Sequence, residues 1–334
     1  MKKIKRALIS VSDKNNLKFL IKNLSRYKIN FISSGGTFKE IKKMGFKCEE
    51  VSKYTRNPEI LSGRVKTLHP KIYAGILAKR NLNSHKNDLK KNNYKEIDLV
   101  IVNFYPFEQT VKQIKNNEKI LENIDIGGPT MVRAAAKNYK DVTVITNISQ
   151  YESLIKNINQ NKGATSLEFR KKSALEAFGE TAYYESLIYN YFRGLNSNEF
   201  SRKFTVGFNL IEKLRYGENP HQEGALYSAS ENLNLDKLNG KQLSYNNYSD
   251  IFAALQISKT FPNKKGTVIV KHGNPCGVSV HENNIESFLH AYKCDPLSAF
   301  GGIVSCNFRV SKKLALRLNK LFFEVIIANG FDKD

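Results

Sequence analysis

The stretch KRALISVSDKNNLKFLIKNLSRYKINFISS, residues 5–34, decides the fold class of the first part of this chain. Residues 5–12 form a short apolar run, residues 15–27 carry apolar side chains at helical spacing, and residues 29–34 form a second strand-like run. A strand, a helix and a strand in this order predict a βαβ unit with parallel strands.

The alternation continues beyond this unit. Further strands are predicted at 46–51, 72–78, 97–105 and 141–147, and further helices at 37–44, around 110–120 and from Pro129 to Asn138. This pattern predicts an α/β domain with a doubly wound parallel sheet. Residues 149–195 are helix-rich, and a new region of strands and helices begins near Phe204. Because 334 residues suffice for two domains, we expect one domain at 1–147, a helical connector at 148–203 and a second α/β domain at 204–334.

Composition excludes several classes of protein. Hydrophobic residues make up 41% and charged residues 25% of the chain, close to globular averages. No apolar run approaches 18 residues, which argues against a membrane-spanning helix. The apolar run after the basic N-terminus is too short for a signal peptide and reads as the first strand. The four cysteines have no ligand spacing, so we expect free thiols, no metal site and a cytoplasmic location.

The net charge of +22 raises the alternative of a nucleic-acid-binding protein. Only 12 of the 53 basic residues are arginines, and the lysines are spread over the whole chain. The sequence contains no arginine cluster and no helix-turn-helix or RNA-binding signature. An anionic small molecule is therefore the expected partner, with no nucleic acid and no membrane.

The sequence SSGGT, residues 33–37, lies between a predicted strand and a predicted helix. Glycines allow the backbone to approach an anion, and the N–H groups of the following helix can bind a phosphate. Ordinary turns between a strand and a helix use the same residues. Ser12 and Lys14 end the first strand, and neighbouring parallel strands place their carboxyl ends at the same edge, so these residues could converge on one anion.

A further motif carries charged side chains. In GRVKTLHPKIYAGIL (63–77), Arg64 and Lys66 occupy alternate positions, which would point both cations to the same side of an extended loop. The alternative is two solvated cations.

Candidates for acid–base chemistry follow later in the chain. Tyr105 ends a hydrophobic strand in NFYPF (103–107). In DIGGPTMVRAAAKN (125–138), Asp125 precedes a helix and Lys137 lies about three turns along it.

The stretch IVKHGNPCGV (269–278) ends an apolar strand with Lys271 and His272 before a Gly-Asn-Pro turn. The pair could simply face water at the end of a strand. Alternatively, the ammonium lowers the pKa of a titratable imidazole at the edge where α/β proteins place their sites.

Six motifs together resemble one family. SGRVKTLHPKIYAGILA, NFYPF and DIGGPTMVRAAAKN are similar to the cyclohydrolase half of the bifunctional AICAR formyltransferase/IMP cyclohydrolase enzymes of purine biosynthesis. LRYGENPHQ (214–222), IVKHGNPCGV and DPLSAFGGIVS (295–305) are similar to the formyltransferase half. The match runs from Ser10 to Gly330. It implies a methylglyoxal-synthase-like domain that closes FAICAR to IMP, followed by a transferase domain related to cytidine deaminases that uses 10-formyltetrahydrofolate as co-substrate.

The resemblance also implies residue roles, a homodimer and no metal or tightly bound cofactor. The sequence HGNPC around Cys276 lacks the glutamate and the second cysteine of the deaminase zinc signature, so Cys276 is not expected to bind zinc. The implied catalytic residues are Lys66, Tyr105, Asp125 and Lys137 for ring closure and Lys271 and His272 for formyl transfer. The implied substrate contacts are Ser12, Lys14, Ser34, Gly36, Thr37, Arg64, Thr67 and Gly127 in the first half, and Arg215, Tyr216, Asn247, Ser298, Phe300 and Gly301 in the second.

Members of this family are longer than 334 residues. We therefore expect the second domain to be only the N-terminal part of the transferase domain, with impaired formyl transfer. A cyclohydrolase-only protein and a non-catalytic remnant are the alternatives. A methylglyoxal synthase or a synthetase regulatory domain would share the first fold, but RVKTLHP, KHGNPCG and SAFGG argue against both.

Overall fold

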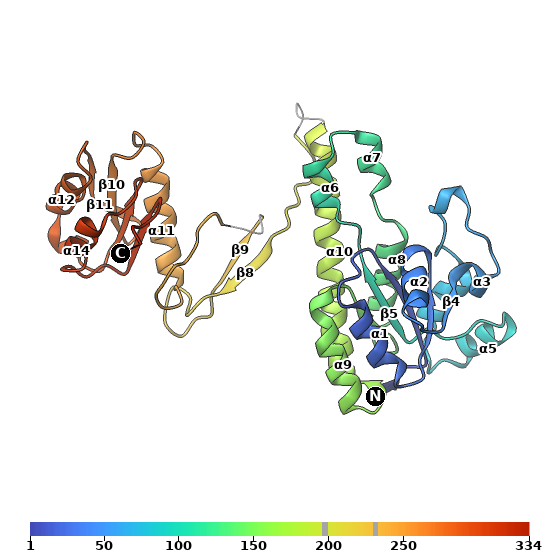
Figure 1. Cartoon of the computed structure of the whole chain (residues 1–334). Helices are drawn as coiled ribbons and strands as arrows, with labels where there is room; N and C mark the ends of the chain where they lie inside the picture. The colour runs from blue at the N-terminus through green and yellow to red at the C-terminus, as the bar shows by residue number, and fades with distance from the viewer. Residues whose placement is uncertain (196–199, 230–232, 334) are drawn as a thin grey trace. The chain divides into compact units, whose positions relative to one another are not determined.

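The computed structural model describes residues 1–195, 200–229 and 233–333. They form two compact units, Met1–Gly207 and Phe208–Asp334, the first blue to yellow-green and the second yellow to red (Figure 1). The assignment of separate functions to 1–147, 148–203 and 204–334 remains a prediction.

A five-stranded parallel sheet forms the centre of the first unit. Its order is β4-β3-β2-β5-β6, and each neighbouring pair is parallel. The strands are β2 (Arg6–Val11), β3 (Asn30–Ser33), β4 (Cys48–Glu50), β5 (Leu99–Asn103) and β6 (Thr143–Ile145). The predicted doubly wound parallel sheet is confirmed.

Helices cover both faces of this sheet (Figure 1). One face is covered by α1 (Leu17–Ser25), α2 (Gly35–Lys43) and α9 (Tyr151–Gln160), and the other by α3 (Val51–Thr55), α4 (Pro70–Leu77), α8 (Gly127–Lys137) and α10 (Leu167–Leu195). The unit also contains α5 (Asn83–Lys91), α6 (Phe107–Gln113) and α7 (Asn117–Glu122). Single 3-10 turns lie at Leu61–Gly63 and Ile148–Gln150, and β1 (Lys2–Lys3) pairs with β7 (Ala164–Thr165).

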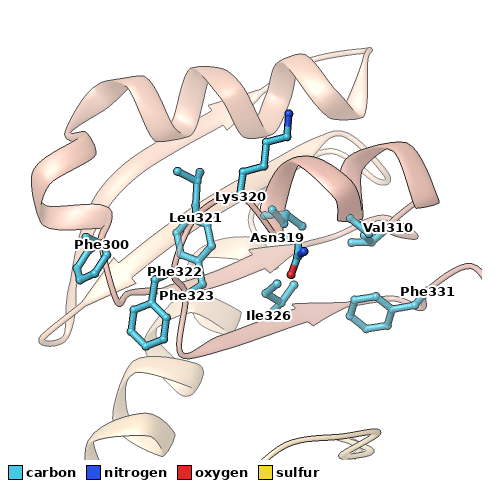
Figure 2. Close-up of a pocket in the computed structure, with 11 residues that line it drawn as sticks. Phe300, Val310, Asn319, Lys320, Leu321, Phe322, Phe323, Ile326 and Phe331 are labelled. Atoms are coloured by element: carbon cyan, nitrogen blue, oxygen red, sulfur yellow. The ribbon is translucent and has the colours of Figure 1, made fainter.

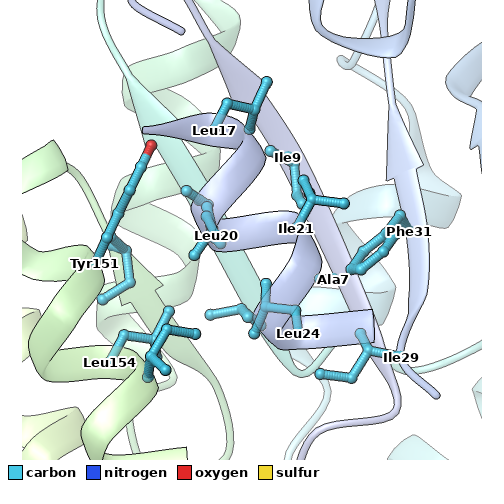
Figure 3. Packing of buried hydrophobic residues seen from close by; sticks show 14 of the residues in the cluster. Ala7, Ile9, Leu17, Leu20, Ile21, Leu24, Ile29, Phe31, Tyr151 and Leu154 are labelled. Carbon is cyan, nitrogen blue, oxygen red and sulfur yellow. The ribbon is translucent and has the colours of Figure 1, made fainter. Parts of the chain in front are cut away.

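Successive side chains along β2 point to opposite faces of the sheet and so belong to two different core clusters. Ile9 belongs to the cluster that contains α1 and α9, whereas Leu8 belongs to the cluster that contains α4, α8 and α10. Figure 3 shows the first cluster, in which Leu20 and Leu24 of α1 lie between the sheet and Leu154 of α9.

The predicted strand at 72–78 was wrong, because these residues form α4. A short apolar run has the same composition in a buried strand and in a buried helix. Pro70 occupies the first turn, and the Nδ1 of His69 accepts the N–H of Lys71 at 3.1 Å as an N-cap. Ile72 and Ile76, four residues apart, are then buried on one helix face.

Asp141 makes the stability of the first unit depend on pH. Its carboxylate lies 2.6 Å from the Lys2 ammonium and accepts the N–H of Arg80 at 3.0 Å. Burial raises the pKa of Asp141, but these hydrogen bonds and charges outweigh burial and hold the pKa below 3.8.

Because the folded pKa is the lower one, the stabilisation from Asp141 is present above the unfolded value and is lost as pH falls through the folded value. Asp141→Asn should therefore reduce the free energy of unfolding at neutral pH and have a smaller effect at an acidic pH below the folded pKa of Asp141. Urea denaturation at both pH values measures this, with the exposed Asp88→Asn as a control. An equal loss at both pH values would contradict it.

The second unit contains a mixed sheet of four strands in the order β11-β10-β12-β13. The strands are β10 (Gly266–Lys271), β11 (Asn274–Val280), β12 (Ile303–Cys306) and β13 (Val325–Ala328); β12 and β13 are parallel, and the other pairs are antiparallel. The helices are α11 (Tyr245–Ser258), α12 (Asn284–Cys294), α13 (Pro296–Ala299) and α14 (Lys312–Leu318), and β8 (Asn209–Lys213) pairs with β9 (Ala225–Ser228). The α/β class is confirmed for this unit also.

Within the described residues, no helix is both long and apolar enough to cross a membrane. The same residues contain no group of three or more His, Cys, Asp or Glu side chains arranged to hold a metal ion.

Candidate functional site

The turn from β3 into α2 presents backbone N–H groups at the carboxyl edge of the parallel sheet. Gly35, Gly36 and Thr37 form the first turn of α2, where N–H groups have no acceptor within the helix. Gly35 has a φ of +51°, in the left-handed region that favours glycine. The preceding residue, Ser34, is extended and makes no side-chain cap. This turn is therefore suited to an anion.

Two lysines from distant parts of the chain lie beside this turn. A Cβ added to Gly36 would lie 3.6 Å from Cε of Lys14, and a Cβ added to Gly35 would lie 3.5 Å from Nζ of Lys66. The structure thus brings the end of β2, the Gly-Gly turn and the loop before α4 together. Two ammonium groups and the helix N-terminus supply positive potential at one place.

Arg64 and Lys66 of the 63–77 motif each have a carboxylate partner. Nζ of Lys66 lies 3.0 Å from Oε1 of Glu59, and the guanidinium of Arg64 binds the carboxylate of Glu122 on α7. These groups are half-buried or exposed, so the pairs are weak enough for an anion to replace them. The joint action of Arg64 and Lys66 on one anion remains a prediction.

The same loop reaches the N-terminus of α8. A Cβ on Gly127 would lie only 2.5 Å from Oγ1 of Thr67, so only glycine allows this close approach. Oδ1 of Asp125 accepts the N–H of Gly128 at 2.8 Å, and the N–H of Asp125 donates to the Tyr184 hydroxyl at 2.8 Å. Burial raises the pKa of Asp125, and the Gly128 N–H partly offsets this. Because Thr67 follows Lys66, the N-termini of α2 and α8 border one site.

The remaining two residues of the predicted cyclohydrolase cluster lie apart. Tyr105 is exposed just after β5, at the same carboxyl edge. Lys137 is the last residue of α8, about 15 Å along the helix axis from Gly127. Since α8 leads back to the start of β6, Lys137 lies at the amino edge of the sheet. The structure therefore places Lys66, Tyr105 and Asp125 at one edge and Lys137 at the other.

The end of β2 is held by side chains whose positioning role sequence reasoning missed. Oγ1 of Thr37 accepts the N–H of Val11 at 3.1 Å and donates to its carbonyl at 2.9 Å. Thr37 was expected to contact substrate, but its hydroxyl is already bound to the backbone. Oδ1 of Asn103 accepts the N–H groups of Ser12 and Asp13 at 2.6 and 3.1 Å. The signal in the sequence was Asn103 itself, a polar residue that directly follows the apolar run of β5.

In the second unit, Lys271 and His272 begin a tight hairpin. Lys271 pairs with Asn274 across β10 and β11, which leaves His272 and Gly273 as a two-residue turn. Both have positive φ, +54° and +76°, as type I′ turns require. Nζ of Lys271 donates to the Phe300 carbonyl at 2.6 Å. The predicted turn is thus present, but Asn274 and Pro275 already belong to the next strand.

Three other predicted transferase residues lie at the start of α11. The guanidinium of Arg215 lies over the Tyr216 ring, 4.8 Å from its centroid, and the Tyr216 carbonyl accepts the N–H of Tyr245 at 3.2 Å. Asn247 and Ser244 form a capping box, and Nδ2 of Asn247 donates to the Glu324 carboxylate at 2.5 Å. The Asn247 amide therefore fixes the start of α11, and a contact with substrate remains a prediction.

The turn 298–301 borders an apolar cavity of about 670 Å³. Ser298 donates its N–H to the Asp295 carboxylate at 3.0 Å. Figure 2 shows Phe300 and Phe322 side by side in the wall of the cavity, with ring centroids 5.4 Å apart. Gly301 has a φ of +73° and donates its N–H to the Phe322 carbonyl at 2.8 Å. Of the predicted site residues, Phe300 lines this cavity, and its own carbonyl accepts the hydrogen bond from Lys271.

Comparison with known proteins assigns a family to this arrangement. Residues 135–334 match the family model described as AICARFT/IMPCHase bienzyme, and residues 16–130 match the MGS-like domain. The chain belongs to the AICARFT/IMPCHase bienzyme family. The match to the bienzyme model alone covers more than half of the chain, and it contains the Lys271–His272 hairpin.

Individual members agree with this assignment. The chain is 44% identical to the bifunctional purine biosynthesis protein PurH of Caldicellulosiruptor bescii and 46% identical to that of Persephonella marina, in each case over 99% of its own length. It spans 66% and 65% of the length of these curated relatives. Among solved structures, it is similar to ForH, with 29% identity and a TM-score of 0.51, covering 57% of this chain and 99% of ForH.

Proposed function

We propose that the first unit closes the ring of FAICAR to give IMP. The observation that carries this proposal is the position of Lys14 and Lys66 beside the Gly35-Gly36 turn. The phosphate of the nucleotide would bind on the Lys14 side of this turn, with Ser12 and Ser34 directly after the two adjoining strands, and Lys66 would face the reacting end of the substrate. The base of the nucleotide would then extend along the loop toward Thr67 and Asp125.

Ring closure depends mainly on the orientation of the two reacting groups of the substrate. The carboxamide nitrogen attacks the formyl carbon to form a tetrahedral carbinolamine, and water then leaves. Holding the two groups of one substrate in contact supplies much of the rate. We assign Lys66 to stabilising the oxygen that becomes negative. Asp125 would take the proton from the attacking nitrogen, with Tyr105 as a further proton donor at the same edge.

We further propose that the second unit belongs to the transferase site of the family. In that role Lys271 and His272 handle the proton released when the AICAR amine takes the formyl group of 10-formyltetrahydrofolate. Arg215, Tyr216 and the Phe300–Gly301 turn would contact AICAR. The curated relatives have about a third of their length without a counterpart in residues 1–334. We therefore expect residues 1–334 by themselves to transfer formyl groups much more slowly than they close FAICAR.

One experiment separates ring closure from its alternatives. The purified chain is incubated with FAICAR, without folate, and IMP formation is followed by absorbance. We expect saturable formation of IMP. A cyclohydrolase-only protein would show this activity without formyl transfer to AICAR, and a non-catalytic remnant would show neither. Salt-dependent RNA binding without IMP formation would favour the nucleic-acid-binding alternative.

The wider cellular assignments also remain proposals. Cys48, Cys276, Cys294 and Cys306 are free thiols in the structure, which supports a reducing, cytoplasmic location. The small-molecule partners would be AICAR, FAICAR and IMP.

We also infer a homodimer that uses an apolar stripe on α10. Leu175 and Phe178 are 73% and 40% exposed, and Ala182 continues the same helix face. Changing both Leu175 and Phe178 to Glu should convert dimers to monomers, because the charges would be buried without partners. Light scattering measures the mass, with Lys86→Glu on the exposed face of α5 as a control. A wild-type chain that is monomeric at micromolar concentration would contradict the proposal.

A further inference from the structure

His272 has a backbone conformation that is uncommon for residues other than glycine. Its φ of +54° lies in the left-handed region, which β-carbon contacts disfavour for L-amino acids. In type I′ turns this position is usually Asn, Asp or Gly. The chain places histidine here, and a group that hydrogen-bonds the backbone of the turn would offset the cost of this conformation.

That group is Asp250 of α11. Its Oδ2 accepts the N–H of His272 at 3.2 Å, and its Oδ1 accepts the N–H of Gly273 at 2.6 Å. One carboxylate therefore binds both N–H groups of the turn. Asn274 adds a third bond, because its Nδ2 donates to the His272 carbonyl at 3.0 Å.

The position of Asp250 links the turn to the rest of the predicted site. Asp250 lies three residues after Asn247, so the two side chains share one face of α11. Asn247 binds Glu324, and the N–H of Glu324 donates to the Gly302 carbonyl at 3.1 Å. Lys271 is fixed independently, through its bond to the Phe300 carbonyl. Two different elements thus orient the two adjacent residues of the Lys-His pair.

We propose that Asp250 is a positioning residue that holds the His272–Gly273 turn, and with it the His272 imidazole, in the orientation that faces the bound amine substrate. This inference rests on the proposed transferase role of the second unit. It predicts that the carboxylate acts through the backbone of the turn and does not itself contact the reacting atoms.

The test uses the 334-residue chain, labelled for NMR, with AICAR as the probe. In the wild type we expect a protected Gly273 amide and an AICAR-induced shift of the His272 imidazole. Asp250→Ala should speed exchange of the Gly273 amide by about 10-fold or more and abolish the imidazole response. AICAR-induced shifts at Arg215 should persist. Asp250→Asn keeps one acceptor oxygen and should restore part of both signals.

The outcomes separate positioning from general stability. A purely structural role would remove the shifts at Arg215 and His272 together, and that result would overturn the proposal. Unchanged amide exchange and an unchanged imidazole response in Asp250→Ala would also overturn it. If wild-type His272 does not respond to AICAR, the proposed transferase role fails. Exchange of the Gly273 amide still decides separately whether Asp250 holds the turn.

Discussion

Replacing Lys66 with alanine is expected to lower the rate of FAICAR ring closure by about 100-fold or more, the usual contribution of a positioned acid, base or oxyanion-stabilising group. The ammonium of Lys66 lies beside Gly35 at the N-terminus of α2, and Lys66 itself belongs to the loop that reaches α8. Its removal takes away positive charge where we propose that the tetrahedral oxygen forms. Steady-state absorbance assays would measure kcat and KM separately.

A matched lysine tests whether charge alone explains the loss. Lys39 lies on the exposed face of α2, so Lys39→Ala removes the same charge from the same helix and should keep near wild-type turnover. Lys66→Arg keeps the charge with a different geometry and should recover only part of the rate. Near wild-type kcat in Lys66→Ala would exclude Lys66 from the reaction.

Asp125→Asn should have an effect of similar size, about 100-fold or more on kcat. The substitution keeps an oxygen that can accept the Gly128 N–H, so the start of α8 should stay intact while the proton acceptor is lost. Asp88→Asn on the exposed face of α5 is the control for removal of a carboxylate. A large fall in melting temperature without a change in kcat would indicate a purely structural role.

The pKa of Asp125 gives this prediction a pH dependence. Burial raises this pKa above its usual value of 3.8. If ionised Asp125 is the base, ring closure should fall as pH decreases through the raised pKa, and so at a higher pH than an exposed aspartate would give. The pH–rate profile of the wild type measures the midpoint. A rate that stays constant down to about pH 4 would contradict the assignment to a base.

Patterns of hydrophobic residues predicted the architecture well and the details less well. The βαβ pattern of residues 5–34 predicted a parallel sheet, because periodicity reflects burial directly. The prediction of a strand at 72–78 was wrong, since a short apolar segment fits both kinds of element; Pro70, in the first turn of α4, is the residue that favours a helix.

The site was predictable as a set of motifs but not as a set of contacts. Parallel strands place their ends at one edge, so the approach of Lys14 to the Gly-Gly turn could be expected. That the Thr37 hydroxyl would bind Val11 could not be read from sequence, because a hydroxyl suits both a ligand and a backbone. Likewise, Lys137 lies within the DIGGPTMVRAAAKN motif, yet the length of α8 carries it to the opposite edge.

The most direct test of the central claim is a crystal structure of the chain with IMP bound. The claim is that the carboxyl edge of the first sheet is the nucleotide site. We predict density for the phosphate at the N–H groups of Gly35 and Gly36, beside Lys14, with the base near Thr67 and Asp125. A nucleotide bound at the amino edge near Lys137, or only within the second unit, would contradict the account.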